Sequence, residues 1–173
     1  MVQALYFFDM DTKLYALLEL ADMEFDGESF NGPSFMATLD GLTAAEAASE
    51  ATFEGYSAWE IAIHCAYYKY LVAEGLDKAD GITPFPYREA SFSPLPSPAD
   101  EDAWRSTRAY LRKAHHGVMK AIRSCTDAEL DAVFPKWEIS FHKTITWLCS
   151  HDIMHNGQVR SMGLASLRRP KER

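Results

Sequence analysis

Two histidines near the end of the sequence, His151 and His155, restrict the fold more than any other feature. Residues four apart on an α-helix are separated by only about 40° around its axis, so the two imidazoles lie on one face. Gln158 lies one turn further along, where it could orient a ligand, a water or a substrate. The same face carries Thr144, Trp147, Leu148, Met154 and Met162. We therefore expect this face to point into the protein.

A buried pair of imidazoles needs hydrogen bonds or a cation, because an unsatisfied polar group in the interior costs about 1–3 kcal/mol. A third histidine, His64, is predicted to face inward from another helix, since Ile61 and Tyr68 share its face at spacings of three and four. Three imidazoles leave coordination positions open on a zinc, nickel, iron or manganese ion, as in a catalytic site. Tyr68 is a candidate pocket residue, and the inward-facing His115 is a candidate pocket residue or fourth ligand.

Helical periodicity recurs along most of the chain. Apolar residues at spacings of three and four, together with capping residues, predict helices and the points where they start. The predicted helices cover residues 2–23, 33–39, 58–74, 98–124, 127–131 and a last segment from about 142 to before 170. Capping boxes pair Thr43 with Glu46, Ser57 with Glu60 and Thr126 with Glu129, and Ser97 is the predicted cap of the helix that follows it.

Residues 81–98 form a long connection rich in proline. Its aromatic residues Phe85, Tyr87 and Phe92 indicate that it packs over the helices. Four long helices with this connection between the second and the third predict an all-α four-helix bundle, a fold whose core often holds metal sites. No run with a period of two predicts a strand, and we expect residues 1–173 to form a single domain.

The histidines have other interpretations. The sequence HDIMH is similar to the HExxH motif of zinc proteases, with Asp152 in place of the catalytic glutamate, but nothing else in the chain follows that pattern. We expect Asp152 to lie in solvent or to support a ligand. Without a metal, the inward histidines would form a hydrogen-bonded core network. His116 and His142 are predicted to lie on the surface.

Charge and cysteine content exclude several classes of partner. The formal net charge of −8 argues against nucleic-acid binding, which depends on Lys and Arg to neutralise phosphates. The three cysteines are odd in number and widely spaced, which predicts reduced thiols in a cytoplasmic protein. No apolar run approaches the roughly 20 residues of a membrane span, and the first residues lack the pattern of a signal peptide. We expect a small-molecule substrate, with no nucleic acid or membrane as partner.

Four blocks of sequence carry a family resemblance. They are residues 30–35 (FNGPSF), 39–43 (LDGLT), 57–61 (SAWEI) leading to His64, and 151–158 (HDIMHNGQ). With these blocks, residues 30–167 resemble the DinB-like superfamily of metal-binding four-helix bundles, which includes the YfiT-type proteins. The chain has Met154 where many relatives have an aromatic residue, a difference that leaves the histidines intact.

The resemblance implies that His64, His151 and His155 bind one divalent ion, usually nickel or zinc. Family members with known reactions, such as bacillithiol S-transferases and mycothiol-dependent maleylpyruvate isomerase, imply a low-molecular-weight thiol as a second cofactor. Relatives are often homodimers. The leading hypothesis is a metal-dependent enzyme, a thiol S-transferase or a hydrolase, that activates a thiol or a water. The alternative is a non-catalytic stress-response bundle that binds a metal or a hydrophobic ligand.

Overall fold

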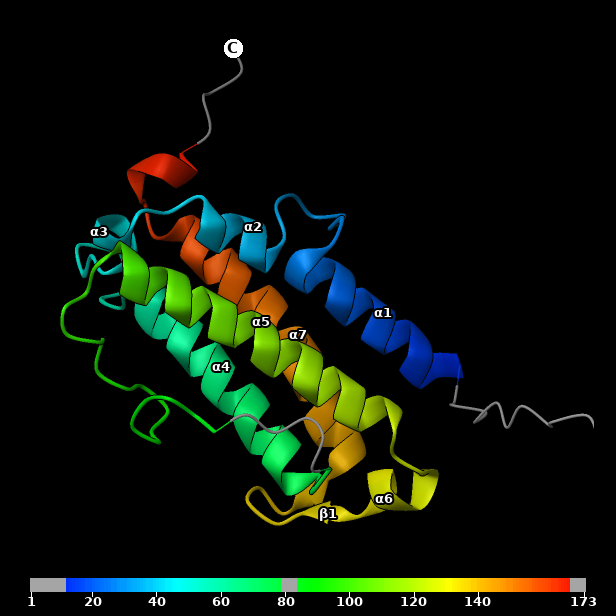
Figure 1. The fold of residues 1–173 in the computed structure, drawn as a ribbon. Helices are drawn as coiled ribbons and strands as arrows, with labels where there is room; N and C mark the ends of the chain where they lie inside the picture. The colour runs from blue at the N-terminus through cyan, green and yellow to red at the C-terminus, as the bar shows by residue number, and fades with distance from the viewer. Residues whose placement is uncertain (1–11, 79–83, 169–173) are drawn as a thin grey trace, which may run out of the picture.

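The structure is a computed structural model that describes residues 12–78 and 84–168. Its elements are α1 (Thr12–Asp26), α2 (Phe35–Asp40), α3 (Ala44–Ala47), α4 (Ala58–Gly75), α5 (Glu101–Arg123), α6 (Asp127–Asp131), β1 (Val133–Phe134), β2 (Ile139–Ser140), α7 (Phe141–Ser161) and the 3₁₀ turn η2 (Ala165–Leu167). The four long helices α1, α4, α5 and α7 form the body of the molecule (Figure 1). The predicted all-α bundle is confirmed. Within the described residues no helix combines the length and apolar composition of a membrane span.

The helices pack so that α7 lies between two neighbours. Helix α4 packs against α5 and α7, and α1 packs against α7 on another side. The short helix α2 also contacts α7, α1 and α5. Residues 84–98 have no regular helix or strand, and Phe85 and Tyr87 pack against the core as the sequence predicted.

Most predicted helix starts are correct. All three capping boxes are present, at Thr43, Ser57 and Thr126. The predicted cap at Ser97 is wrong, because α5 starts at Glu101 and the Asp100 side chain accepts a hydrogen bond from the backbone N–H of Ala103. An ionised carboxylate at this position also interacts favourably with the positive end of the helix dipole.

Other boundaries differ by a few residues. Helix α1 continues to Asp26, three residues beyond its predicted end, and the predicted stretch 2–11 lies outside the described residues. Helix α2 begins after Ser34, whose hydroxyl caps it. Helix α7 ends at Ser161, followed by Gly163 with a φ of 84°, a left-handed conformation that favours glycine after a helix.

A β-hairpin between α6 and α7 was not predicted. Its two-residue strands pair Val133 with Ser140 and Phe134 with Ile139. Strands this short show no alternating pattern of apolar and polar residues, so periodicity could not reveal them. The turn holds Trp137, followed by Glu138 with a φ of 55°.

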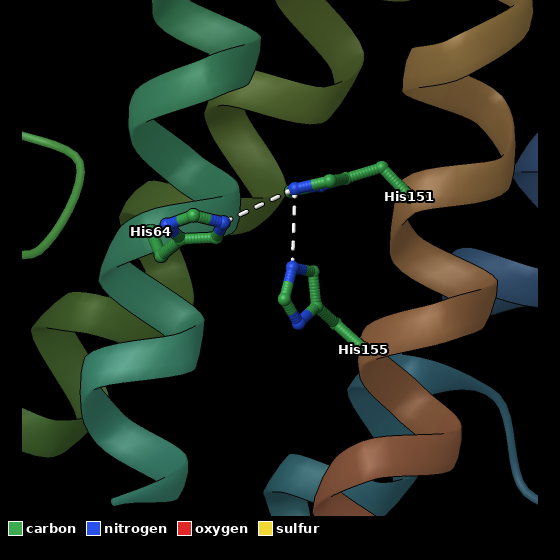
Figure 2. A group of neighbouring side chains, drawn as sticks. All are labelled: His64, His151 and His155. Carbon is green, nitrogen blue, oxygen red and sulfur yellow. Dashed lines mark hydrogen bonds between the residues drawn. The ribbon is translucent and has the colours of Figure 1, made fainter. Parts of the chain in front are cut away.

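A layer of buried polar residues divides the apolar core in two. Along α4 one apolar cluster takes residues up to Ala66 and the other takes residues from Val72. Helices α5 and α7 also place one end in the first apolar cluster and the other end in the second. The buried polar residues in the layer are Lys69, His115, His151, Asp152 and His155. Figure 2 shows two of these histidines with His64, which joins them from α4.

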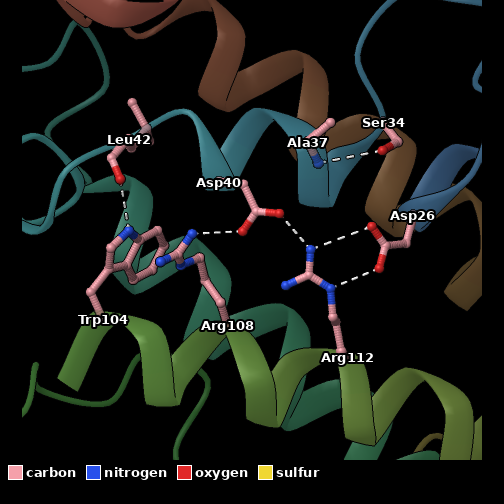
Figure 3. A network of polar contacts seen from close by, with 8 residues as sticks. All are labelled: Asp26, Ser34, Ala37, Asp40, Leu42, Trp104, Arg108 and Arg112. Carbon is pink, nitrogen blue, oxygen red and sulfur yellow. Dashed lines mark hydrogen bonds and ion pairs between the residues drawn. The ribbon is translucent and has the colours of Figure 1, made fainter. Parts of the chain in front are cut away.

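Two arginines of α5 bind carboxylates of other helices (Figure 3). Arg112 donates from Nε to Asp26 at 2.7 Å and from Nη2 to Asp40 at 2.5 Å. Arg108 donates to the other oxygen of Asp40 at 2.6 Å. Because Asp26 ends α1 and Asp40 ends α2, this network holds the α1–α2 connection against α5.

We expect Arg112→Ala to lower the free energy of unfolding by about 1 kcal/mol, since the three side chains are partly exposed and solvent weakens each ion pair. Urea denaturation measures the change. Arg105→Ala removes an exposed pair within α5, with Asp102, and should leave the unfolding midpoint unchanged. Equal effects of the two variants would show that the network does not hold α1 and α2.

Candidate metal centre

Three imidazole rings from two helices meet in the interior (Figure 2). His64 extends from α4, and His151 and His155 extend from successive turns of α7. Nε2 of His151 lies 3.1 Å from Nε2 of His64 and 3.1 Å from Nε2 of His155. The three residues are only 5–7% exposed. The structure thus brings together the three histidines that the sequence singled out.

Hydrogen bonds on the far side of two rings determine where their protons are. Nδ1 of His64 lies 2.8 Å from the carbonyl oxygen of Ser91, which can only accept a hydrogen bond. Nδ1 of His155 lies 2.7 Å from Oε1 of Gln158. The amide nitrogen of Gln158 donates to Glu54, so its oxygen faces the imidazole. Both Nδ1 atoms therefore carry the proton, and both Nε2 atoms direct a lone pair at His151.

This arrangement is unsatisfied without a cation. His151 has one Nε2 atom facing two lone pairs, and a single N–H there could serve only one of them. Its Nδ1 atom is buried and has no hydrogen-bond partner. If His151 carried its proton on Nδ1 instead, the Nε2 lone pairs of all three histidines would face one another. A metal ion that accepts all three Nε2 atoms removes the conflict, so these residues fit a divalent transition-metal ion.

The electrostatics also favour metal binding. Burial lowers the pKa of His64 to about 4. Burial, followed by the neighbouring His155 and His64, lowers the pKa of His151 to about 2. Burial likewise lowers the pKa of His155. All three rings are therefore neutral near pH 7, the form in which imidazole binds metals.

The pKa of His64 predicts how the metal-free protein responds to acid. Between pH 6.5 and about 4 the unfolded chain takes up a proton at this residue while the folded chain does not, so we expect the free energy of unfolding to fall across this range. Urea denaturation at pH 7 and pH 4.5 would measure the fall. His64→Leu cannot take up the proton and should show a smaller fall, whereas an equal fall would show that His64 does not contribute.

Gln158 and Glu54 hold His155 in place. A hydrogen-bond acceptor on the outer nitrogen of a liganding histidine fixes the ring and its proton, and its loss typically weakens metal affinity by about 10–100-fold. We expect a loss of this size in Gln158→Leu, measured by competition with a chromogenic chelator. Met154→Leu introduces the same residue at an exposed position of α7 and should retain wild-type affinity. Equal affinities in the two variants would contradict this role.

Of the other two predicted pocket residues, Tyr68 and His115, one lies beside the three histidines and the other does not. Tyr68 lies in the site, with its ring edge-on to His64 at 4.8 Å and to His151 at 5.4 Å between centroids. His115 lies in a different part of the polar layer, where Nε2 bonds to Asp22 at 2.9 Å and the ring stacks on Phe25. It does not join the three converging histidines.

Asp152 was expected in solvent or in support of a ligand, and the solvent position is wrong. It is 3% exposed and forms an ion pair with Lys69, whose side chain is fully buried. Asp152 is buried because α7 is covered on more than one side, by α1 and by α4. A single apolar stripe in the sequence cannot reveal such burial.

A second group of metal-binding side chains overlaps the first. Atoms of Cys65, His151 and Asp152 lie within 4.8 Å of one another. Burial raises the pKa of the Cys65 thiol well above its ordinary value, and the Lys69 ammonium already neutralises Asp152. A positive charge bound beside this group disfavours a second cation there. The three histidines are therefore the better candidate site.

Sequence reasoning missed three residues that shape the site. Ser91 acts through a backbone carbonyl, and Glu54 lies in an irregular segment, so neither carries a motif. Phe92, whose ring stacks on His64 at 4.5 Å, was expected only to pack over the helices.

Comparison with known proteins identifies a family for this chain. A model of the DinB superfamily matches residues 32–159, which include all three histidines. Searches of curated proteins and of solved structures return no match.

Proposed function

The chain belongs to the DinB superfamily, and from this premise we propose that it is an enzyme that binds one divalent ion, nickel or zinc, through His64, His151 and His155. It would activate a low-molecular-weight thiol or a water for attack on a small electrophile. The observation that supports this proposal is the convergence of three neutral Nε2 atoms whose hydrogen-bonding needs conflict without a cation.

The protein residues have distinct roles in this proposal. Three imidazoles provide part of a coordination shell and leave at least one position open for thiol or water. Ser91 and Gln158 fix two of the rings through Nδ1, so the Nε2 atoms are oriented before the ion arrives. When bound, the ion lowers the pKa of a coordinated thiol or water toward neutrality. The rings of Phe92 and Trp147 pack on His64 and His151 and limit access of bulk water.

A panel of thiols and electrophiles tests the proposal. We expect turnover with at least one thiol–electrophile pair, or hydrolysis of the electrophile, in the metal-loaded protein. A chelator should abolish this activity, and added nickel or zinc should restore it. His116→Ala, which changes an exposed histidine, is the control that should keep full activity. Activity that persists after complete metal removal would contradict the proposal.

A non-catalytic bundle that binds a metal or a hydrophobic ligand is the second candidate. It is favoured by the absence of a free general base among the described residues near the histidines. The nearby carboxylates are already engaged, Asp152 by Lys69 and Glu54 by Gln158. This candidate expects stoichiometric metal binding without turnover in the same panel. A cytoplasmic location and a homodimer are also part of our proposal for either candidate.

A further inference from the structure

An apolar pocket lies beside the candidate metal centre, between the β1–β2 hairpin and the helices α4 and α7. It has a volume of about 360 Å³ and is lined by Tyr68, Trp137, Ile139 and Trp147. We call it the hairpin pocket. All four residues are partly buried and partly exposed, so the pocket is open to solvent. Its volume lies near the lower end of the range for small-molecule sites.

The hairpin pocket shares two of its walls with the metal centre. The Trp147 ring lies 4.3 Å from the His151 ring between centroids, and the Tyr68 ring lies 5.4 Å from it. The same two rings contact Trp137, at 4.8 Å and 5.8 Å. A molecule in the pocket would therefore lie one side chain away from a proposed ligand.

The lining indicates what kind of molecule fits. None of the four side chains carries a charge, and three of them are aromatic. Aromatic and branched aliphatic walls favour apolar ring or alkyl groups, because burying apolar surface away from water is favourable. A strongly hydrated ion would lose its water shell here without gaining a charged partner.

The backbone of the hairpin supports a role in placing Trp137. Glu138, the next residue, has a φ of 55°, a left-handed conformation that is uncommon for residues with a side chain. Backbone N–H groups of Trp137 and Glu138 both bond to the carbonyl oxygen of Phe134, which closes the turn. The turn thereby places Trp137 against Tyr68 and Trp147. Strained positions of this kind concentrate at functional sites.

We infer that the hairpin pocket binds the apolar, aryl or branched-alkyl, part of the electrophile on which the metal centre acts. The inference rests on the proposed function, because only that function makes the bound molecule an electrophile. It adds a substrate class to that function, namely electrophiles that carry an uncharged hydrophobic group.

The four tryptophans provide an experiment with internal controls. Benzyl alcohol is titrated into ¹⁵N-labelled full-length protein, and the indole N–H signals are followed by NMR. We expect saturable shifts for Trp137 and Trp147, while Trp59 and Trp104, which are fully buried, stay unchanged. Acetate, a strongly hydrated anion that the faces of the aromatic rings do not attract, should cause no saturable shift. Uniform small shifts, or none, would overturn the inference.

Two variants link the shifts to the pocket. Trp137→Ala should weaken benzyl alcohol binding at least about tenfold, as expected for loss of an aromatic anchor. Ile139→Ser is a milder change that keeps the aromatic walls, and it should weaken binding less. The unchanged signals of Trp59 and Trp104 show that each variant is folded. Unaltered affinity in both variants would overturn the inference.

Metal content and oligomeric state show whether the pocket, the metal centre or both proposals fail. Benzyl alcohol should bind with or without metal, because no histidine lines the pocket. Binding of benzyl alcohol to a protein that never takes up metal would leave the pocket in place and reject the proposed function. Metal uptake without the shifts would reject the pocket alone. Indole signals that change with protein concentration in the absence of probe would show that a second copy covers the pocket, and would overturn the inference.

Discussion

Replacing His151 with alanine should abolish stoichiometric metal binding. His151 is the ring that contacts both other imidazoles, and its removal leaves one donor on α4 and one on α7. The loss should exceed the roughly 100-fold upper limit expected for residues that only support a ligand. Elemental analysis of tag-free protein should show about one metal ion per wild-type chain and almost none in the variant.

Thermal unfolding gives a second reading of the same variant. A ligand present at 100 times its dissociation constant stabilises a folded protein by about 2.7 kcal/mol. We therefore expect zinc or nickel to raise the Tm of the wild type but not that of His151→Ala. His116→Ala should bind metal and respond like the wild type, because His116 is exposed. Full metal content in His151→Ala would contradict the proposed ligand set.

Replacing Lys69 with methionine should lower the free energy of unfolding more than any other single substitution proposed above. The Lys69 side chain is fully buried and forms an ion pair with Asp152, which is itself buried. Removing one partner leaves a charge in the core without compensation, at a cost of about 3–5 kcal/mol. Urea denaturation of metal-free protein would measure this loss without a contribution from metal binding.

A double variant separates the charge effect from the packing effect. Lys69→Met combined with Asp152→Leu removes both charges and should recover much of the lost stability, because buried ion pairs are often replaceable by apolar residues. Lys78→Ala breaks an ion pair with Glu129 at the surface and should change stability little. A double variant no more stable than Lys69→Met would show that packing, and not charge, is responsible.

The sequence was most informative where local chemistry decides the structure. Thr43, Ser57 and Thr126 cap helices as predicted, because capping depends on a hydroxyl and a carboxylate three residues apart. The convergence of the three histidines could be predicted from the sequence for a similar reason. Their spacing on two helices fixed the face on which each ring lies, and all three rings proved to be buried. Met154 was expected on the same inward face of α7 and is instead 54% exposed.

Features that depend on tertiary packing could not be predicted from the sequence. Nothing local distinguishes His115 from His64, since both face inward, and only the helix arrangement places His115 beside Asp22 and Phe25. The partnership of Asp152 with Lys69 joins residues 83 positions apart. The hairpin that holds Trp137 has strands too short to leave a pattern.

X-ray absorption spectroscopy of zinc-loaded protein tests the central claim most directly. The account predicts a first shell with three imidazole nitrogens at about 2.0–2.1 Å, completed by a light donor from solvent or buffer, and no sulfur. A sulfur scatterer at about 2.3 Å would instead place the ion on Cys65 with His151 and Asp152. That result, or a shell with fewer than three imidazoles, would contradict the assignment of His64, His151 and His155 as the metal ligands.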